Sequence, residues 1–238
     1  MKKIRALHSW IDNLPPDLRA EVLQHMCLRH YRDGETVYRL GEEGHELYMV
    51  KSGKVRSCNY TQKGKEIQYI VFQAGDCFGE LSLIDGLCRV HSTYALGSTD
   101  LLVLHQRDFE TLYAKHPQIP IEINKTLSRR LRISHTTIDD ATVLPMRDRL
   151  ARLLGRLAYS ISTADEHGQT VLEGFTHENL ARMLGSTRES ISRELKKLEE
   201  EGLLQRRYGK ILVPDIAALI GSCDGLVGGE SIVPDYNQ

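Results

Sequence analysis

The spacing of hydrophobic positions divides the chain into segments of different texture. In residues 1–30 the spacing is helical, carried by Leu7, Trp10, Ile11, Leu14, Leu18, Val22 and Leu23. From residue 31 to about residue 104, glycines separate short apolar runs roughly every ten residues, which predicts short strands joined by tight turns. The clearest runs are Thr36–Tyr38, Leu47–Val50, Ile67–Phe72 and Leu101–Leu104. A small β-sandwich or barrel is expected, with Lys63-Gly64-Lys65 at a hairpin tip.

Residues 118–144 return to a helical period. The seam, with positions spaced by four and three residues, consists of Leu127, Leu131, Ser134, Ile138 and Ala141. Such an a/d pattern predicts a helix that pairs with a second copy of itself, although an amphipathic helix packed on its own domain would carry a similar stripe. Pro145 is expected to end this helix at a hinge, so that a second domain begins at about Met146.

Residues 176–198, THENLARMLGSTRESISRELKKL, predict two short helices joined by a glycine turn. Thr176 is suited to cap the first helix, and Gly185 is suited to end it in a left-handed conformation. Ser186 and Glu189 have the spacing of a capping box at the start of the second helix. The expected buried positions are Leu180, Ala181, Leu184, Ile191, Leu195 and Leu198. The segment is therefore predicted to be a helix-turn-helix.

The outer face of the second helix predicts contacts with the DNA major groove. An arginine can bond both O6 and N7 of guanine, and a glutamate can accept from the cytosine amino group. We assign Arg188 and Arg193 to guanines and Glu189 to a cytosine; the alternative is that Glu189 and Arg193 are only a surface pair. Within this segment, the residues expected at the DNA are Arg188, Glu189, Ser192, Arg193, Lys196, Thr176, Ser186 and Thr187.

The segment after Gly202, LLQRRYGKILVPD, has the pattern of two strands around a turn at Tyr208-Gly209-Lys210. This small wing places Arg206, Arg207 and Lys210 where phosphate contacts are expected. The alternative is a hairpin that only faces solvent.

Residues 221–238 contain glycines, a proline and little periodicity, so they are expected to form a flexible tail.

The composition of the chain excludes some classes of protein, but its net charge does not indicate a binding partner. The chain has 238 residues, 26% of them charged, and a net charge of −1, so any nucleic-acid surface must be a local patch. The five cysteines form no C-x-x-C pair, which disfavours a zinc ribbon or a disulfide framework. No signal peptide or membrane span is expected. A cytoplasmic protein is therefore predicted. It is not expected to be an enzyme, because no nucleophile–base constellation or metal-ligand pair is evident in the sequence.

Residues 78–91, FGELSLIDGLCRVH, have the order of a phosphate pocket, with a Gly-Glu pair before a short helix and an arginine at position 89. Together with the glycine-rich strands, the long helix containing RRL and the TRESISR segment, this order resembles the cyclic-AMP receptor/fumarate-nitrate regulator (Crp/Fnr) family. The resemblance covers about residues 10–215. It implies an α+β fold with an N-terminal cyclic-nucleotide-binding-like β-roll (jelly roll), a long dimerisation helix and a C-terminal winged helix-turn-helix. The implied divisions are 1–117, 118–144, 145–220 and a tail at 221–238.

The resemblance also implies a bacterial transcription regulator. The alternative is a cyclic-nucleotide-binding module unrelated to transcription, which would lack the unit at residues 176–198. In this family an effector in the β-roll changes how the two dimer helices meet, which brings the DNA-binding domains into register with a two-fold operator. The resemblance implies that Arg188, Glu189 and Arg193 read a half-site similar to TGTGA. Residues 162–170 lie where activators of the family contact RNA polymerase.

For the effector site, the resemblance implies a pocket with Glu80 on the ribose hydroxyl, Arg89 on the phosphate and Arg130 bracing the glutamate. The implied ligand-binding set is Gly79, Glu80, Leu81, Arg89, Val90, Arg130, Ser134 and His135. Two positions depart from the family pattern. Val90 replaces a Ser or Thr that bonds the phosphate, and His135 replaces a serine that reaches adenine from the partner subunit.

Three alternatives for the effector therefore stay open: cyclic AMP, another anionic ligand, or no small ligand with Arg89 paired to Glu80 in an empty pocket. His91 is a candidate replacement donor for the hydroxyl that Val90 lacks. Cys77 and Cys88 flank the pocket, which suggests thiol sensing as a further hypothesis. An iron–sulfur cluster is not expected. His25, Cys27 and His30 are interpreted as helix residues rather than metal ligands.

Overall fold

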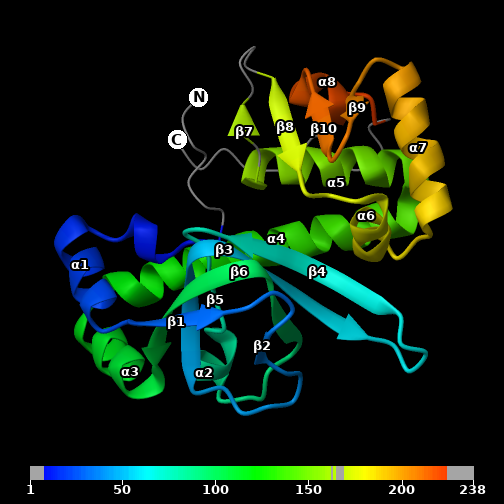
Figure 1. Cartoon of the computed structure of the whole chain (residues 1–238). Coiled ribbons are helices and arrows are strands. Elements are labelled where there is room, and N and C mark those ends of the chain that lie inside the picture. The colour runs from blue at the N-terminus through cyan, green and yellow to red at the C-terminus, as the bar shows by residue number, and fades with distance from the viewer. Residues whose placement is uncertain (1–7, 162, 165–168, 224–238) are drawn as a thin grey trace. The chain divides into compact units, whose positions relative to one another are not determined.

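The computed structural model describes residues 8–161, 163–164 and 169–223. The chain forms two compact units, one within Arg5–Arg130 and the other from Leu131 onward (Figure 1). Among the described residues, no helix is both long enough and apolar enough to cross a membrane.

Antiparallel strands build the first unit. They are β1 (Cys27–Tyr31), β2 (Thr36–Tyr38), β3 (Glu46–Tyr60), β4 (Glu66–Gln73), β5 (Cys77–Phe78) and β6 (Ser92–His105). Their order is β1-β6-β3-β4, with β2 paired to β6 and β5 paired to β3. The expectation of uniformly short strands is wrong for β3 and β6, which have 15 and 14 residues. The reason is that Gly53 and Gly97, with φ of 80° and 70°, lie inside these strands rather than in turns.

The predicted hairpin tip at Lys63-Gly64-Lys65 is confirmed. It joins β3 to β4, where Tyr60 pairs with Glu66. The Thr61 N–H donates to the Lys65 carbonyl at 2.9 Å, and Gly64 has a φ of 75°. A glycine is suited to this position because a Cβ disfavours a positive φ.

Helices cover the first unit's sheet. They are the 3₁₀ helix η1 (Ile11–Asn13), α1 (Pro16–Gln24), α2 (Leu81–Asp85), α3 (Gln106–Lys115) and the first part of α4 (Gln118–Val143). One core cluster joins Trp10, Leu47, Leu104, Phe109 and Ile119, all at most 3% exposed. The helical interpretation of residues 27–30 is wrong, because Cys27 and His30 belong to β1 and pair with Val103 and Asp100 of β6.

α4 continues into the second unit, and its predicted seam faces outward there. Leu131 is 57% exposed and Ile138 is 62% exposed, while Ala141 is also exposed. The helix ends at Val143, two residues before Pro145, as predicted. The next helix, α5 (Met146–Ile161), begins directly after this proline.

The second unit contains a sheet and a bundle of helices. After α5 come β7 (Thr163–Ala164), β8 (Thr170–Glu173), α6 (His177–Leu184), α7 (Arg188–Glu200), β9 (Gln205–Arg207), β10 (Lys210–Val213) and α8 (Ile216–Gly221). The sheet has the order β7-β8-β10-β9. The core contains Leu150, Leu154, Leu180, Ile191, Leu195, Leu198 and Leu219, all fully buried.

The packed structure extends further toward the C-terminus than the predicted tail allows. Gly221 is the last residue of α8, and Cys223 is 8% exposed within the core cluster. The predicted flexible tail at 221–238 is therefore wrong for residues 221–223, because α8 needs its last turn to reach the core. Residues 224–238 lie outside the described residues.

Candidate nucleic-acid interface and effector site

The first helix of the predicted helix-turn-helix begins and ends as expected. Thr176 caps α6, since its hydroxyl accepts from the Asn179 N–H at 3.1 Å, and the Asn179 side chain accepts from the Thr176 N–H in return. Gly185 follows α6 with a φ of 64° in the left-handed region. Leu180 and Ala181 are buried, as predicted, and Leu184 is half-buried.

The second helix begins one residue later than predicted. Thr187, not Ser186, caps α7, because its hydroxyl accepts from the Ser190 N–H at 3.2 Å. The predicted capping box between Ser186 and Glu189 is therefore wrong. Two adjacent hydroxyl residues carry the same sequence signal, and the turn after Gly185 decides which of them reaches the helix. The shift makes Arg188 the first residue of α7.

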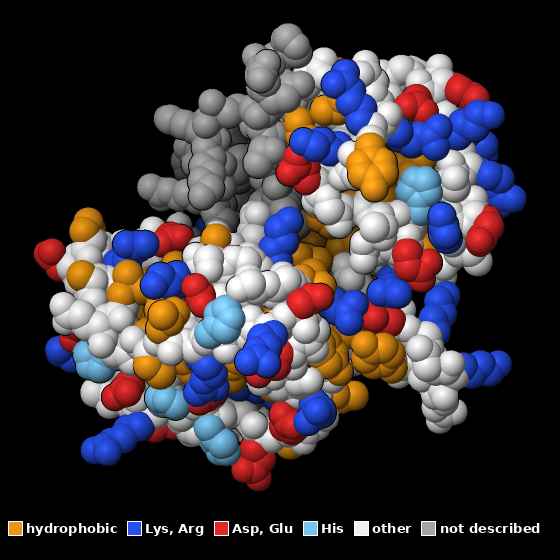
Figure 2. Space-filling model, in the orientation of Figure 1, with side chains coloured by type: hydrophobic (Ala, Val, Ile, Leu, Met, Phe, Trp, Pro, Cys, Tyr) orange, Lys and Arg blue, Asp and Glu red, His pale blue; other side chains and the backbone are white. Residues whose placement is uncertain are grey.

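The face of α7 opposite the core carries the predicted base-reading residues. Arg188, Glu189, Arg193 and Lys196 are exposed, and Ser192 is half-buried. The alternative of a Glu189–Arg193 surface pair is not seen, since none of the ion pairs found among the described residues joins these two side chains. Figure 2 shows Lys and Arg side chains along the edge where Figure 1 places α7, interspersed with acidic ones. Two exposed arginines and one glutamate near a helix start can hydrogen-bond to base edges.

The predicted wing is present as β9 and β10, joined at Tyr208 and Gly209. Its three basic residues differ in their surroundings. Arg207 is exposed, whereas Arg206 is held by Glu199 of α7, with Nε 2.7 Å from the carboxylate. Lys210 forms an ion pair with Glu173 of β8. Of the three, Arg207 is therefore the residue best placed for a phosphate.

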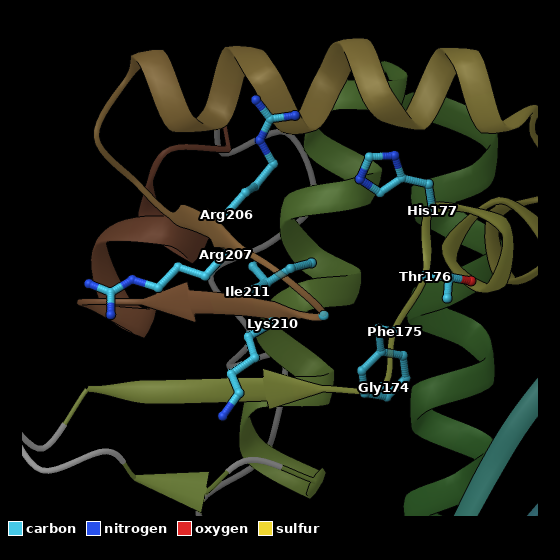
Figure 3. A pocket seen from close by; sticks show the side chains of 9 residues that line it. Gly174, Phe175, Thr176, His177, Arg206, Arg207, Lys210 and Ile211 are labelled. Atoms are coloured by element: carbon cyan, nitrogen blue, oxygen red, sulfur yellow. The ribbon is translucent and has the colours of Figure 1, made fainter.

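A cavity of about 230 Å³ lies between the wing and the start of α6 (Figure 3). Its lining includes Gly174, Phe175, Thr176, His177, Arg206, Arg207, Gly209, Lys210 and Ile211. Burial first, and then the positive charges of Arg206 and Arg188, lower the pKa of His177. His177 is not among the residues predicted from the sequence. The one local signal for it is its position directly after Thr176, the residue that caps the first helix.

In the first unit, the structure brings Glu80 and Arg130 together. Glu80 precedes α2 and is 2% exposed, and its Oε1 forms an ion pair with Nη1 of Arg130 on α4. Its second carboxylate oxygen, Oε2, is buried without a hydrogen-bond partner among the described residues. A buried acceptor without a donor costs free energy, so Oε2 is a position at which a hydroxyl donor of a ligand would be stabilised.

Arg89 does not pair with Glu80, which corrects the predicted pairing for an empty pocket. Its Nη1 donates to the Gly79 carbonyl and its Nη2 to the Glu46 carbonyl, both at 2.6 Å. The guanidinium lies 4.4 Å from the centre of the Tyr38 ring. The two carbonyls can accept from Arg89 because residue 79 is a glycine with a φ of 88°. A Cβ at this position would lie 3.1 Å from Nη1 of Arg89 and 3.2 Å from the Glu46 carbonyl oxygen. The Nε of Arg89 is buried without a hydrogen-bond partner among the described residues, so this nitrogen is a donor that an anion can use.

The remaining residues of the implied pocket have varied surroundings. Leu81 is 38% exposed and Val90 is 53% exposed. His91 is half-buried near the Tyr38 and Tyr69 rings, and burial is the main reason why its pKa is lowered. Lowering this pKa makes His91 a neutral hydrogen-bonding group rather than a cation at neutral pH.

Ser134 and His135 are exposed on the part of α4 that belongs to the second unit. Their contribution to the effector site stays a prediction. Burial raises the pKa of the Cys77 thiol to about 12, which disfavours the reactive thiolate, and thiol sensing at this residue stays a prediction. Cys88 is exposed.

Comparisons with known proteins agree with this two-part architecture. Residues 28–116 match the family model for a cyclic nucleotide-binding domain, and residues 148–221 match the model for a Crp-like helix-turn-helix domain. The chain is 32% identical over 206 residues to the cyclic AMP receptor protein of Thermus thermophilus, covering 87% of this chain and 92% of that protein. It is 25% identical over 215 residues to a CRP-like cAMP-activated global transcriptional regulator of Mycobacterium tuberculosis, covering 90% and 96%.

Solved structures give the same result. The c-di-GMP responsive global regulator CLP of Xanthomonas campestris superposes with a TM-score of 0.71 at 26% identity, covering 84% of this chain and all of that one. A CooA mutant from Carboxydothermus hydrogenoformans gives a TM-score of 0.70 at 26% identity, covering 85% and 89%. The two relatives are named for cyclic AMP and the CLP structure for c-di-GMP, so proteins similar to this chain respond to different nucleotides.

Proposed function

Because the chain belongs to the Crp/Fnr family of transcription regulators, we propose that it is a cytoplasmic homodimer that binds a two-fold operator and responds to a small anionic effector. The observation that carries the proposal is the exposed face of α7, where Arg188, Glu189 and Arg193 project from a capped helix. DNA binding itself follows from the family.

The proposed operator contains two half-sites similar to TGTGA. The first turns of a recognition helix enter the major groove in helix-turn-helix proteins, a geometry for which a member of this family is a standard example. Arg188 and Arg193 would each donate two hydrogen bonds to a guanine, and Glu189 would accept from a cytosine. Thr176, at the cap of α6, and Arg207, on the wing, would contact phosphates and so set the position of α7.

Replacing Arg188 tests the base assignment. Binding of full-length protein to a labelled two-fold TGTGA duplex and to a scrambled duplex would be followed by fluorescence anisotropy at fixed salt. Arg188→Ala is expected to lose about 1–3 kcal/mol of preference for the specific duplex while it keeps salt-sensitive binding to both. Lys115→Ala, on α3 of the other unit, removes the same charge and should leave the preference unchanged. Equal preference in wild type and Arg188→Ala would show that the assignment is wrong.

The proposed dimer interface is the seam of α4. Leu131 and Ile138 are more than half exposed, which is unusual for large aliphatic side chains at regular helical spacing. A second copy of the helix would bury these side chains. A two-fold dimer also explains why a two-fold operator is expected.

Cyclic AMP is the first candidate effector. The buried Oε2 of Glu80 lacks a donor, and a ribose hydroxyl would supply one. The neighbouring Arg89 offers positive charge for a phosphate, and its buried Nε has no hydrogen-bond partner among the described residues. Two relatives described as a cyclic AMP receptor protein and a cAMP-activated regulator support this candidate, whereas the structural similarity to a c-di-GMP responsive regulator supports another anionic nucleotide.

A second candidate is a regulator that uses no small ligand. The observation in its favour is that backbone carbonyls already engage both terminal nitrogens of Arg89, while the Tyr38 ring lies against the guanidinium. Calorimetric titration of nucleotide-stripped protein distinguishes the candidates. Micromolar binding of cyclic AMP that is lost in Glu80→Gln and kept in Glu66→Gln supports the first candidate. An absence of heat and of thermal stabilisation with cyclic AMP and with other cyclic nucleotides supports the second.

A contact between residues 162–170 and RNA polymerase stays a prediction, since most of this segment lies outside the described residues.

A further inference from the structure

Three side chains from neighbouring strands meet on the first unit's sheet, and neither the DNA interface nor the effector pocket uses them in this way. The Cys27 Sγ lies 3.8 Å from Nε2 of His105, and Nδ1 of His105 lies 3.2 Å from Oε1 of Glu46. The thiol is exposed, and the His105 side chain is 52% exposed. A nucleophile within reach of a base that is oriented by a third group is the usual arrangement of an activated thiol.

The register of the sheet holds these residues together. β6 lies between β1 and β3, Cys27 pairs with Val103 on β6, and His105 pairs with Glu46 on β3. Directly paired residues share a face of the sheet, and so do residues two positions apart on one strand. Strand pairing alone therefore places three residues side by side, namely Cys27, His105 and Glu46. None of the three lies in a loop.

Further contacts fix Glu46 as a carboxylate. Arg29 donates to both of its oxygens at 2.8 and 2.9 Å, and the Tyr48 hydroxyl donates at 2.7 Å. Burial opposes ionisation of Glu46, yet the hydrogen bonds from Arg29 and Tyr48 leave its pKa lowered. When Nδ1–H of His105 donates to this carboxylate, Nε2 presents a lone pair to the thiol. Glu46 then stabilises the imidazolium that forms when Nε2 takes the thiol proton.

We propose that Cys27 is a site of reversible oxidation by hydroperoxides, with His105 as its base and Glu46 as a positioning residue. His105 takes the thiol proton, which leaves a thiolate beside an imidazolium. The thiolate sulfur attacks one peroxide oxygen, so that an S–O bond forms and the O–O bond breaks. Sulfur is oxidised by two electrons and the peroxide is reduced. The imidazolium proton passes to the departing oxygen, which leaves as water from hydrogen peroxide. The sulfenic acid returns to the thiol when a thiol reductant acts on it.

The other cysteines serve as internal references. Cys88 is exposed, and the described residues place no ion pair or hydrogen bond on its side chain. Cys58, Cys77 and Cys223 are buried. A difference in alkylation rate between Cys27 and Cys88 therefore reflects the surroundings of Cys27. If Cys58, Cys77 and Cys223 are not alkylated, the fold is intact.

The experiment is site-resolved alkylation of the reduced full-length protein by iodoacetamide between about pH 6 and pH 9, read by peptide mass spectrometry. At pH 7 Cys27 is expected to be alkylated about threefold faster than Cys88, because His105 can take the thiol proton. His105→Gln should remove this difference. Glu46→Gln should remove part of it.

Treatment with hydrogen peroxide followed by a dimedone-type probe completes the test. Selective labelling of Cys27 that is reversed by a thiol reductant and reduced in His105→Gln supports the proposal. Equal labelling of Cys27 and Cys88 in the folded wild type would overturn it. So would an alkylation profile of Cys27 that His105→Gln leaves unchanged while Cys58 and Cys223 stay protected.

Discussion

Arg130 on α4 forms an ion pair with the buried carboxylate of Glu80, which precedes α2 and lies 50 residues earlier in the chain. Arg130 also donates to the Cys77 and His8 carbonyls. These contacts fasten the first part of α4 to the residues that form the candidate effector site. A ligand hydroxyl that binds Oε2 of Glu80 would therefore act on the same carboxylate that holds α4.

Removal of Arg130 should destabilise the first unit. Arg130→Met leaves Glu80 buried without its partner, and breaking a buried ion pair in this way costs about 3–5 kcal/mol of unfolding free energy. Urea unfolding would measure the loss. The double variant Arg130→Met with Glu80→Leu should recover most of it, since no buried charge remains. A double variant as unstable as the single one would contradict this account of the pair.

The stability of the first unit should fall in mild acid because of His8. Burial, followed by the charges of Arg130 and Arg129, lowers the pKa of His8 from 6.5 to about 3. The unfolded chain therefore binds a proton that the folded state excludes. Stability is complete above pH 6.5 and is lost as the pH falls toward 3, by up to about 1.4 kcal/mol per pH unit.

The measurement is urea unfolding at about pH 7 and pH 5.5, a window set by the ordinary pKa of histidine. His8→Gln cannot take up the proton, so its unfolding free energy should change about 1 kcal/mol less between the two pH values than that of the wild type. His25→Gln, at an exposed position after α1, is the matched control and should keep the wild-type difference. Identical pH dependence in wild type and His8→Gln would contradict the prediction.

A charge in the α4 seam should separate the proposed dimer. Ile138→Asp would place a carboxylate next to its own copy across the two-fold axis, where burial and like charge both disfavour association. Analytical ultracentrifugation should show a dimer for the wild type and a monomer for the variant. Thr136→Asp, outside the seam on the same helix, should remain a dimer. A wild-type monomer at micromolar concentration would remove the basis for this prediction.

His177 should make DNA affinity depend on pH. Its pKa is lowered in the free protein by burial and by Arg206 and Arg188, so the imidazole is neutral at neutral pH. A DNA phosphate in the cavity of Figure 3 would favour the charged form, so binding would take up a proton. Affinity should then rise as the pH falls from about 8 to 6.

Anisotropy titrations of the wild type and two variants across this pH range measure the effect. His177→Gln should show a weaker pH dependence, and His177→Arg should bind more tightly at high pH and lose the dependence. The same slope in all three proteins would show that His177 does not face a phosphate in the complex.

The local signals in the sequence predicted most of the second unit. Thr176, Gly185 and the buried face of α7 follow from capping and helical periodicity, which act within a few residues. The error at Ser186 arose where two neighbouring hydroxyl residues could serve as the cap. The strand at 27–31 was missed because its pairing with β6 joins residues about seventy positions apart, and no local pattern records such pairing.

The site geometry was predictable only where family resemblance supplied it. The family resemblance implied that Arg130 contacts Glu80, and the two side chains form an ion pair in the structure. The turn of Arg89 toward the Gly79 and Glu46 carbonyls depends on three-dimensional packing around Tyr38 and was not predictable. The same is true of Cys27 and His105, which are 78 positions apart and meet only through strand register.

Operator binding by the proposed dimer is tested by the affinity of the full-length wild-type protein for three labelled duplexes at one salt concentration, with and without cyclic AMP. The duplexes carry two inverted TGTGA half-sites, one half-site, or a scrambled sequence. We expect one dimer on the two-fold duplex and a preference over the scrambled duplex of at least about 1,000-fold when the effector is bound. Equal affinity for the three duplexes in every condition would show that the protein does not read a two-fold TGTGA operator.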